Sequence, residues 1–263
     1  MGQKIHPIGF RVGVIRGWES KWYSDKGYAD GIRQDNVIRR WIRKNLSSAA
    51  VSRTEIERQG DATTVTIYTA KPGILIGKGG KGIEDVRTAL QKLTKSQVHV
   101  NIQEIRYPDI DAQLVADSIA QQVSKRIAYK RAMRQAILRA MRLGAKGIRV
   151  SCAGRLGGSE MARREHMRDG KIPLHTLRAD IDYGFSEGPT TYGNIGIKVW
   201  IYKGDVLPGS ERATEADIVP RREAMRADRG GRSGDRGDRG GRGRSGGRGR
   251  GRGRSGESGG GTF

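Results

Sequence analysis

Glycine and lysine alternate in one short stretch of this chain, Gly77-Lys78-Gly79-Gly80-Lys81, which stands between two apolar segments. A glycine has no Cβ, so a phosphate group can come close to the main chain at these positions. The backbone N–H groups at the start of a following helix also favour an anion, and the two lysines add positive charge. The stretch therefore predicts a loop that binds phosphate.

Several kinds of phosphate site use such a loop. The Walker loop is excluded because Lys78 is followed by glycine, where that loop needs serine or threonine. The spacing Gly77-x-Gly79-x-x-Gly82 matches the dinucleotide fingerprint, but there the first glycine directly follows a strand, and here residues 71–76 intervene. Gly77-Lys78-Gly79-Gly80 fits the Gly-x-x-Gly loop of the KH domain, which clamps single-stranded backbone. An ordinary glycine-rich turn is the remaining interpretation.

A second group of basic residues, Lys130, Arg131 and Arg134, lies in a segment with helical periodicity. Residues three and four positions apart lie on the same face of a helix, so these side chains cluster. A charged helix face is most often simply solvated. No acid lies between Asp117 and Glu160, however, so salt bridges within the helix do not neutralise the cluster, and contact with a polyanion explains it better.

The overall composition also indicates a nucleic-acid partner. The 263 residues include 50 Lys and Arg against 28 Asp and Glu, with a formal net charge of +22 and a pI near 10.6. Such a charge favours nucleic acid over a membrane surface. No apolar run approaches about 20 residues, so we predict no membrane span, and we predict no signal peptide. Cys152 is the only cysteine and the four histidines are scattered, which predicts a cytosolic chain without disulfide, metal or cofactor.

The glycine loop needs elements on both sides to position it. Apolar residues recur at helical spacing from Val37, with Asp35 as a candidate N-cap, and a second helix is expected after the loop over residues 81–94. Alternating patterns predict strands over residues 51–58, 63–69 and 98–105. The apolar run at residues 74–76, directly before the loop, is expected to form a short helix. The order helix, strand, strand, helix, helix, strand is that of a type II KH domain, which we predict for residues 24–107.

The basic cluster is expected in a second domain, residues 108–207. Asp111 is a candidate cap for a long helical segment whose apolar stripe changes near Tyr129, which predicts two helices or one bent helix. The rest is strand-like, with Asp169-Gly170 as a hairpin signal and Gly188-Pro189 as a link between strands. Strands are predicted over residues 148–153, 174–185 and 195–203. The fold class is therefore α+β, with two helices packed on a mostly antiparallel β-sheet.

The two ends of the chain differ from these domains. Residues 1–23 keep no regular period and carry Trp18 and Trp22 among basic residues, which fits an extended arm that follows RNA or an end that docks on the body. Residues 208–263 contain few apolar side chains and become almost wholly Arg, Gly, Ser and Asp. They cannot bury enough apolar surface to offset the entropy of ordering, so we predict a disordered RGG-like tail.

Several motifs occur in an order that resembles one known family. They are MGQKIHPIGFRVG at residues 1–13, KPGILIGKGG at 71–80, Gly144 to Gly147, GRLGG at 154–158, PLHTLRADIDY at 173–183 and TTYGNIGIKVWIYKG at 190–204. The chain resembles the KH-containing ribosomal protein family, number three, of the bacterial small subunit. The resemblance covers about residues 1–207.

This resemblance implies a structural, non-enzymatic protein of the 30S head in the bacterial cytoplasm, bound to 16S rRNA beside small-subunit proteins ten and fourteen. It also implies that Lys130, Arg131 and Arg134 grip mRNA where it enters the particle and help to open its hairpins. Lys130 and Arg134 exchange lysine and arginine relative to the family pattern, and Gly79 stands where a second lysine is common. These departures keep the charge of the helix cluster and remove one cation from the loop.

Basic residues of the arm and of the predicted sheet complete the candidate site. We expect rRNA contacts from Lys4, His6, Arg11, Arg149, Arg155, Arg163, Arg164, Arg178 and Lys198. Two other function classes stay open: a free single-stranded RNA-binding chaperone that uses the KH domain and the tail, and a dinucleotide-dependent enzyme. The second would need a catalytic constellation and a small-molecule substrate, and the sequence offers no such constellation.

Overall fold

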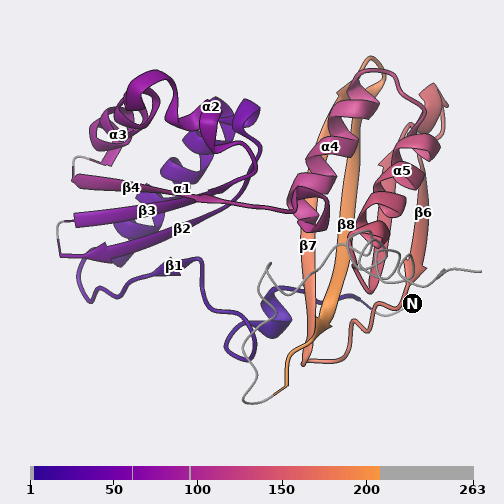
Figure 1. Ribbon diagram of the computed structural model, residues 1–263, viewed down its shortest axis with the longest axis horizontal. Helices are drawn as coiled ribbons and strands as arrows, with labels where there is room; N and C mark the ends of the chain where they lie inside the picture. Colours follow the sequence, from indigo (N-terminus) through magenta and orange to yellow (C-terminus); the bar gives the residue numbers. More distant parts are fainter. Residues whose placement is uncertain (1–2, 61, 95, 208–263) are drawn as a thin grey trace, which may run out of the picture. The chain divides into compact units, whose positions relative to one another are not determined.

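The computed structural model describes residues 3–60, 62–94 and 96–207 (Figure 1). The predicted RGG-like tail lies outside the described residues. Within them, the chain forms the two α+β domains that the sequence predicts, preceded by the N-terminal arm.

The first domain has the predicted KH order of elements. These are α1 (Tyr28–Asn45), β2 (Val51–Gln59), β3 (Ala62–Thr69), α2 (Pro72–Ile76), α3 (Lys81–Thr94) and β4 (Gln97–Glu104), with a short β1 (Ser20–Lys21) supplied by the arm. The sheet order is β1-β2-β3-β4, with β2 antiparallel to β3 and the outer pairs parallel. Ile38 of α1 and Leu90 of α3 pack with Ile67 of β3 in one buried cluster. The helices thus bury their apolar stripes against one face of the sheet.

The first helix differs from the prediction. It begins at Tyr28, after Gly27 in the left-handed conformation, so Asp35 lies inside the helix and is not its cap. The side chain of Asp35 is buried and accepts hydrogen bonds from Ser20 Oγ at 2.9 Å and from Trp22 Nε1 at 2.8 Å. Arg58 also binds this carboxylate. The partners of Asp35 are distant in sequence, so its local sequence alone resembles that of a helix cap.

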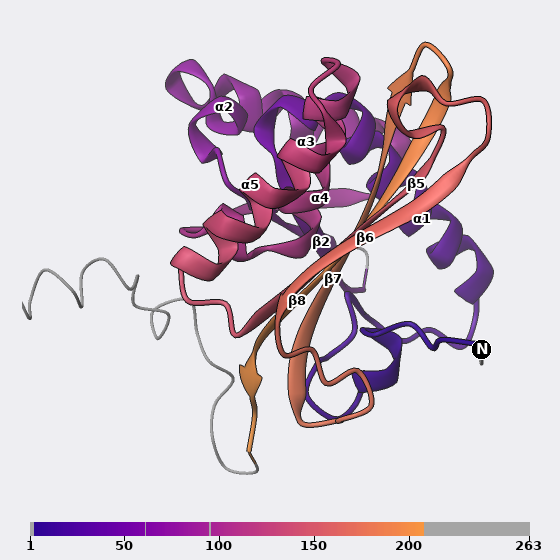
Figure 2. The ribbon, with the colours of Figure 1, turned by 90° about the vertical axis from the view of Figure 1, so that its right-hand side faces the viewer.

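The second domain contains two helices on one face of an antiparallel sheet, as Figure 2 shows. Asp111 caps the first helix as predicted, accepting from the N–H groups of Gln113 and Leu114 at 3.1 Å. The elements are α4 (Ala112–Ser124), α5 (Tyr129–Arg142), β5 (Gly147–Gly154), β6 (Arg163–Gly170), β7 (Ala179–Thr190) and β8 (Gly193–Asp205). The sheet order is β6-β5-β8-β7, and Ile119 and Met133 pack with Val199 between helices and sheet.

Two predicted turns of this sheet are wrong. The chain does not reverse at Asp169-Gly170, because β6 pairs with β5 and residues 171–178 carry the chain to β7 at the opposite edge. A Cβ on Gly170 would overlap the carbonyl oxygen of Lys146, so this glycine serves a close chain contact. Gly188 and Pro189 lie within β7, and the turn into β8 falls at Thr191-Tyr192. Gly188 faces α4 closely, and Pro189 is tolerated because β7 is an edge strand.

Candidate nucleic-acid interface

The glycine loop links two helices through backbone conformations that favour glycine. Gly77, Gly79 and Gly80 have φ values of 68°, 63° and 79°, in the range that side chains disfavour. A Cβ on Gly82 would overlap the carbonyl oxygen of Leu75, so the end of α2 and the start of α3 approach closely. Lys78 and Lys81 are exposed beside this narrow crossing. The loop therefore presents main chain and two cations together.

This arrangement does not match a dinucleotide site. There the glycines connect a strand directly to a helix, whereas here α2 stands between β3 and the loop. No group of three or more His, Cys, Asp or Glu in the described residues could hold a metal ion. Burial raises the pKa of the Cys152 thiol to about 12, so it stays protonated within the core. No helix in the described part of the chain is long and apolar enough to cross a membrane.

The second candidate surface is the solvent face of α5. Lys130, Arg131 and Arg134 are exposed on it and line one shallow hollow with Ala128, Gln135 and Leu138. The opposite face of the helix, with Ala132, Met133 and Ile137, is buried in the core. Among the described residues, Arg131 and Arg134 have no ion-pair partner. The predicted clustering of these cations on one helix face is therefore present in the structure.

Glu165 on β6 partly balances this cluster, which the sequence reasoning missed. Its carboxylate accepts from Tyr129 Oη at 2.9 Å and from Arg163 Nε at 3.1 Å, and lies 3.9 Å from Lys130 Nζ. The hydrogen bond from Tyr129, with the charges of Arg163 and Lys130, lowers the pKa of Glu165. The helix itself carries no acid, and this one comes from a strand, 36 residues after Tyr129 in the chain. Arg163 consequently lies on the α5 side of the sheet.

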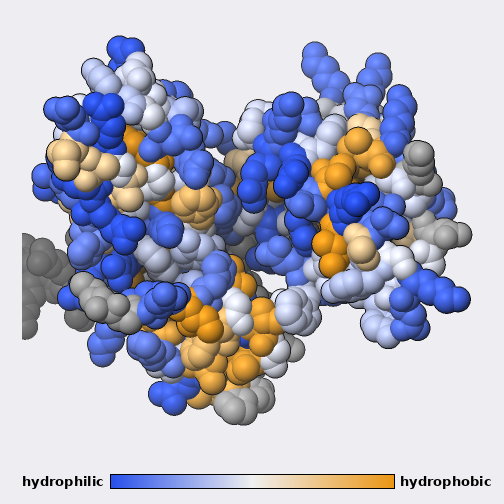
Figure 3. All heavy atoms as spheres, turned by 180° about the vertical axis from the view of Figure 1, so that it is seen from behind, coloured by the Kyte–Doolittle hydropathy of each residue, from blue (hydrophilic) through white to orange (hydrophobic). Residues whose placement is uncertain are grey.

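The third surface is the outer face of the second sheet, opposite α4 and α5. The strand register places Arg149 beside Trp200 and Arg168, and Lys198 beside Ser151. Arg164 lies on the same face, opposite Ala153. Viewed from behind, hydrophilic residues dominate the described surface and separate its hydrophobic patches (Figure 3). Three of the predicted rRNA residues, Arg149, Arg164 and Lys198, thus share one face.

The other predicted sheet residues lie apart from this group. Arg155 follows β5, with its guanidinium 5.3 Å from the ring centre of Tyr192 at the β7–β8 turn. Arg178 lies at the other end of β8, where it is exposed and 3.4 Å from Asp205. Both remain accessible, but they do not form one patch with Arg149.

Arg11 contradicts the prediction of an rRNA contact. Its side chain is fully buried, and its guanidinium donates to main-chain carbonyl oxygens. The acceptors are Ala179 at 2.6 Å, Pro7 and Thr176 at 2.9 Å, Leu174 at 3.1 Å and Pro173 at 3.4 Å. These donors hold the arm and the segment before β7 together and are not free for phosphate. Lys4 and His6 are exposed, with the His6 ring 4.7 Å from that of Tyr183.

Arg16 fixes the arm further along the same sheet. It forms salt bridges of 3.1 Å with both Asp180 and Asp182, and Lys203 lies 3.7 Å from Asp182. Burial works to raise the pKa of the Asp182 carboxyl, but Lys203 and Arg16 together lower it below its ordinary value. The arm is therefore docked by buried charge pairs, while β1 joins it to the first sheet.

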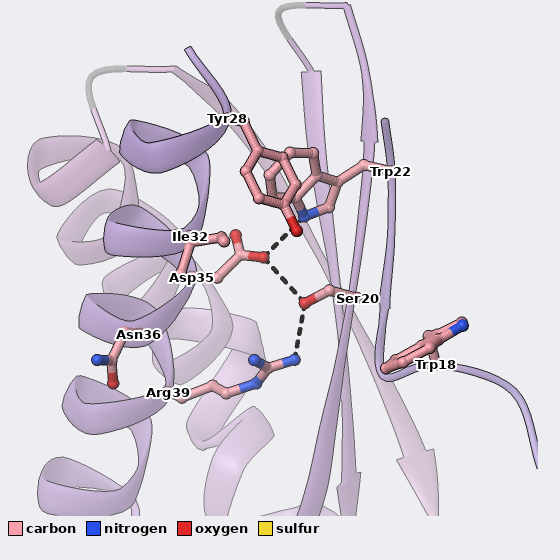
Figure 4. Close-up of a pocket in the computed structure, with 8 residues that line it drawn as sticks. All are labelled: Trp18, Ser20, Trp22, Tyr28, Ile32, Asp35, Asn36 and Arg39. Atoms are coloured by element: carbon pink, nitrogen blue, oxygen red, sulfur yellow. Dashed lines mark hydrogen bonds between the residues drawn. The ribbon is translucent and has the colours of Figure 1, made fainter. Parts of the chain in front are cut away.

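A pocket of about 480 Å³ lies where the arm passes α1 (Figure 4). Trp22 forms one wall, with its ring 5.4 Å from that of Tyr28 and its N–H bound to the buried Asp35. Arg39 reaches the same group through Ser20 Oγ at 2.8 Å. Trp18 remains 71% exposed. Of the two readings of these tryptophans, docking on the body holds for Trp22, while stacking on bases stays a prediction for Trp18.

Comparison with known families follows the same two domains. Residues 37–110 match the family described as KH domain, and residues 119–201 match Ribosomal protein S3, C-terminal domain. The small ribosomal subunit protein uS3 of Listeria welshimeri is 55% identical over 215 residues, which cover 82% of this chain and 99% of that protein. The protein of the same name from Myxococcus xanthus is 58% identical over 209 residues, 80% of this chain and 95% of its own. That of Anaeromyxobacter dehalogenans is 56% identical over 213 residues, covering 81% and 95%.

Proposed function

The chain belongs to the ribosomal protein S3 family, and from this membership we propose that it is a structural constituent of the small ribosomal subunit in the bacterial cytoplasm. The family is structural and not enzymatic. We further propose that the chain binds 16S rRNA in the 30S head and contacts mRNA where it enters. Small-subunit proteins ten and fourteen are proposed neighbours on the strength of the family resemblance alone.

The proposed rRNA contacts are the glycine loop, the free part of the arm and the outer sheet face. The exposed Lys78 and Lys81, with the main chain of the loop, offer donors for a phosphate backbone. Lys4 and His6 extend this capacity to the arm, and Arg149, Arg164 and Lys198 to the sheet. Contacts of this kind fix the position of a protein on RNA without reading its sequence.

The observation that carries the proposed mRNA contact is the exposed cation cluster of α5. Arg131 and Arg134 lack ion-pair partners among the described residues, so their charge is available to a phosphate backbone. Lys130 shares the hollow, but its ammonium group lies 3.9 Å from the carboxylate of Glu165, so we expect it to contribute least of the three to RNA binding. Cations that hold a single strand lower the cost of separating it from its complement, so the cluster would aid the opening of mRNA hairpins without nucleotide hydrolysis.

Sucrose-gradient sedimentation tests membership of the ribosome. We expect the protein in near-stoichiometric amount in small subunits and whole ribosomes, and we expect it to stay there at high salt. Recovery only in light fractions would contradict the proposal and favour a free RNA-binding chaperone, whose purely electrostatic binding falls steeply with salt.

The triple variant Lys130→Ala, Arg131→Ala, Arg134→Ala tests the mRNA contact. We expect normal assembly but impaired translation through a message hairpin, because the cations are exposed and their loss leaves the core intact. For a single strand, the slope of log K against log salt should become shallower by about 2, since each phosphate contact contributes roughly 0.7.

Arg139→Ala is a matched control for this triple variant. Arg139 is also an exposed cation of α5, but it lies outside the hollow. We expect its hairpin passage to stay near that of the unchanged protein. Normal hairpin passage by the triple variant, or an equal defect in the control, would contradict the assignment.

A further inference from the structure

Aromatic side chains lie beside cationic ones in two neighbouring rows on the outer face of the second sheet. In the first row, cross-strand pairing places Arg149 beside Trp200 and Trp200 beside Tyr183. In the second row, Lys198 lies beside Phe185. The two rows are separated by two residues along β7 and β8, which corresponds to about 7 Å in a strand. Such a pattern is more ordered than a general scatter of basic residues.

The first row is already assembled by contacts within the chain. The guanidinium of Arg149 lies 5.2 Å from the ring centre of Trp200, whose ring lies 5.5 Å from that of Tyr183. His6 then meets Tyr183 edge-on. These contacts fix the side chains before any ligand arrives, so little conformational entropy remains to be lost on binding. A guanidinium plane held in this way is a known surface for stacking a base.

The second row is open to solvent. The side chain of Phe185 is 43% exposed, although a large aromatic group is normally covered. The ammonium group of Lys198 lies 5.9 Å from its ring centre, and Lys198 is itself exposed. An exposed ring beside a cation provides a π-face for a base and a charge for the phosphate that joins it to the next nucleotide.

The charges of this face also fit an anionic chain. Strand alternation along β6 places Arg164, His166 and Arg168 on it, opposite Ala153, Ser151 and Arg149. Glu187, opposite Gly196, is the acid that the register of β7 adds in the same area. The face therefore carries a clear excess of cations around the aromatic rows. This complementarity favours a nucleic acid over an apolar segment of another protein.

We propose that this face is a stacking platform for unpaired bases, and that it holds two successive nucleotides of single-stranded RNA. One base lies against Phe185, the next against the Arg149–Trp200 pair, and the phosphates face Lys198 and the cations of β6. Duplex RNA is not the ligand, because its bases are already stacked on one another. Aromatic side chains on the open face of a four-stranded sheet bind bases in this way in other RNA-binding domains. The proposal rests on the proposed RNA-binding function and adds the kind of RNA.

Photocrosslinking locates the contact directly. The full chain is irradiated with a single-stranded RNA of about 12 nucleotides that carries 5-iodouridine, and the adducts are mapped on proteolytic peptides. We expect an adduct on the peptide that carries Phe185, which competing single strand removes and competing duplex of equal length does not. Adducts confined to the glycine loop and α5 would overturn the proposal, as would equal competition by duplex.

Two substitutions of Phe185 separate stacking from apolar contact. Phe185→Tyr keeps the ring and should keep both the adduct and the affinity. Phe185→Leu keeps an apolar side chain at an exposed position but removes the π-face, and should weaken single-strand binding at this face about 5- to 150-fold, the range expected for one stacked base. The binding assay uses the background Lys130→Ala, Arg131→Ala, Arg134→Ala to reduce binding elsewhere. Equal affinity of the two variants would refute the stacking role.

The outcome can be told apart from failure of the proposed function. Incorporation of Phe185→Leu into small subunits is followed in the same sucrose gradients. If the unchanged protein enters ribosomes but gives no adduct on this face, only the stacking platform is contradicted. A protein that binds single strands at this face but never enters ribosomes contradicts the ribosomal role and leaves the platform in place.

Discussion

Replacement of Arg11 by alanine is expected to lower the free energy of unfolding by about 3–5 kcal/mol, because it removes a buried charged group with several hydrogen bonds. The guanidinium of Arg11 satisfies main-chain carbonyl groups from the arm and from residues 173–179. Without it, these carbonyl groups lose their hydrogen-bond donor, and the arm loses its contact with residues 173–179. Urea unfolding of the full chain measures the change, with the slope expected to stay constant.

Two further variants define the origin of this effect. Arg11→Lys keeps the charge, but one ammonium group cannot reach acceptors arranged around a planar guanidinium, so it should recover only part of the loss. Arg178→Ala is the exposed control on the same domain: its ion pair with Asp205 lies in solvent, and we expect a change of less than about 1 kcal/mol. Similar stability of the Arg11→Ala and Arg178→Ala proteins would show that the buried network is not important for folding.

The second large effect is expected from Gly184→Ala on β7. A Cβ at this position would overlap the carbonyl oxygen and the carbonyl carbon of Ala112, which belong to the main chain at the start of α4. The helix cannot move away without breaking the hydrogen bonds that tie its start to β7, from the Ala112 N–H to Asp182 Oδ2 at 3.1 Å and between Gln113 and the main chain of Phe185, so overpacking should cost about 3 kcal/mol. Urea unfolding again measures the loss.

Gly196→Ala is the matched control for this substitution. Gly196 lies on the neighbouring strand β8, and its added Cβ would meet Phe185 at 3.7 Å, an ordinary van der Waals contact. We expect its stability to remain within about 1 kcal/mol of the unchanged protein. If both alanine variants lose the same free energy of unfolding, the effect comes from replacing a strand glycine in general and not from the close approach of α4.

The sequence predicted those elements whose signals are local. The helix α3 begins and ends at the predicted residues because its buried positions, such as Val86 and Leu90, repeat at helical spacing. The cap at Asp111 was predictable for the same reason, since its partners lie two and three residues ahead. The start of α1 was missed because residues 28–34 have no continuous apolar stripe, and because the buried Asp35 accepts a hydrogen bond from Arg58 on β2, 23 residues later in the chain.

The same distinction applies to the candidate site. Lys130, Arg131 and Arg134 share one face because helix geometry requires it. The burial of Arg11 and the pairing of Arg163 with Glu165 depend on strands that are distant in sequence or on the direction in which a strand side chain points. No charge pattern indicates such contacts, because an arginine that binds carbonyl groups and one that binds phosphate have the same local sequence. The tertiary structure was needed to tell them apart.

The arm can dock only after the C-terminal part of the chain has been synthesised. Arg11 and Arg16 precede their partners in the segment 173–182 by more than 160 residues. At a translation rate of about 5–20 residues per second, the arm waits roughly 10–30 s for these partners to appear. During that interval two arginines destined for the interior remain in water on the nascent chain. The completion of the C-terminal sheet, and not the order of translation, therefore determines when the earliest part of this chain reaches its final place.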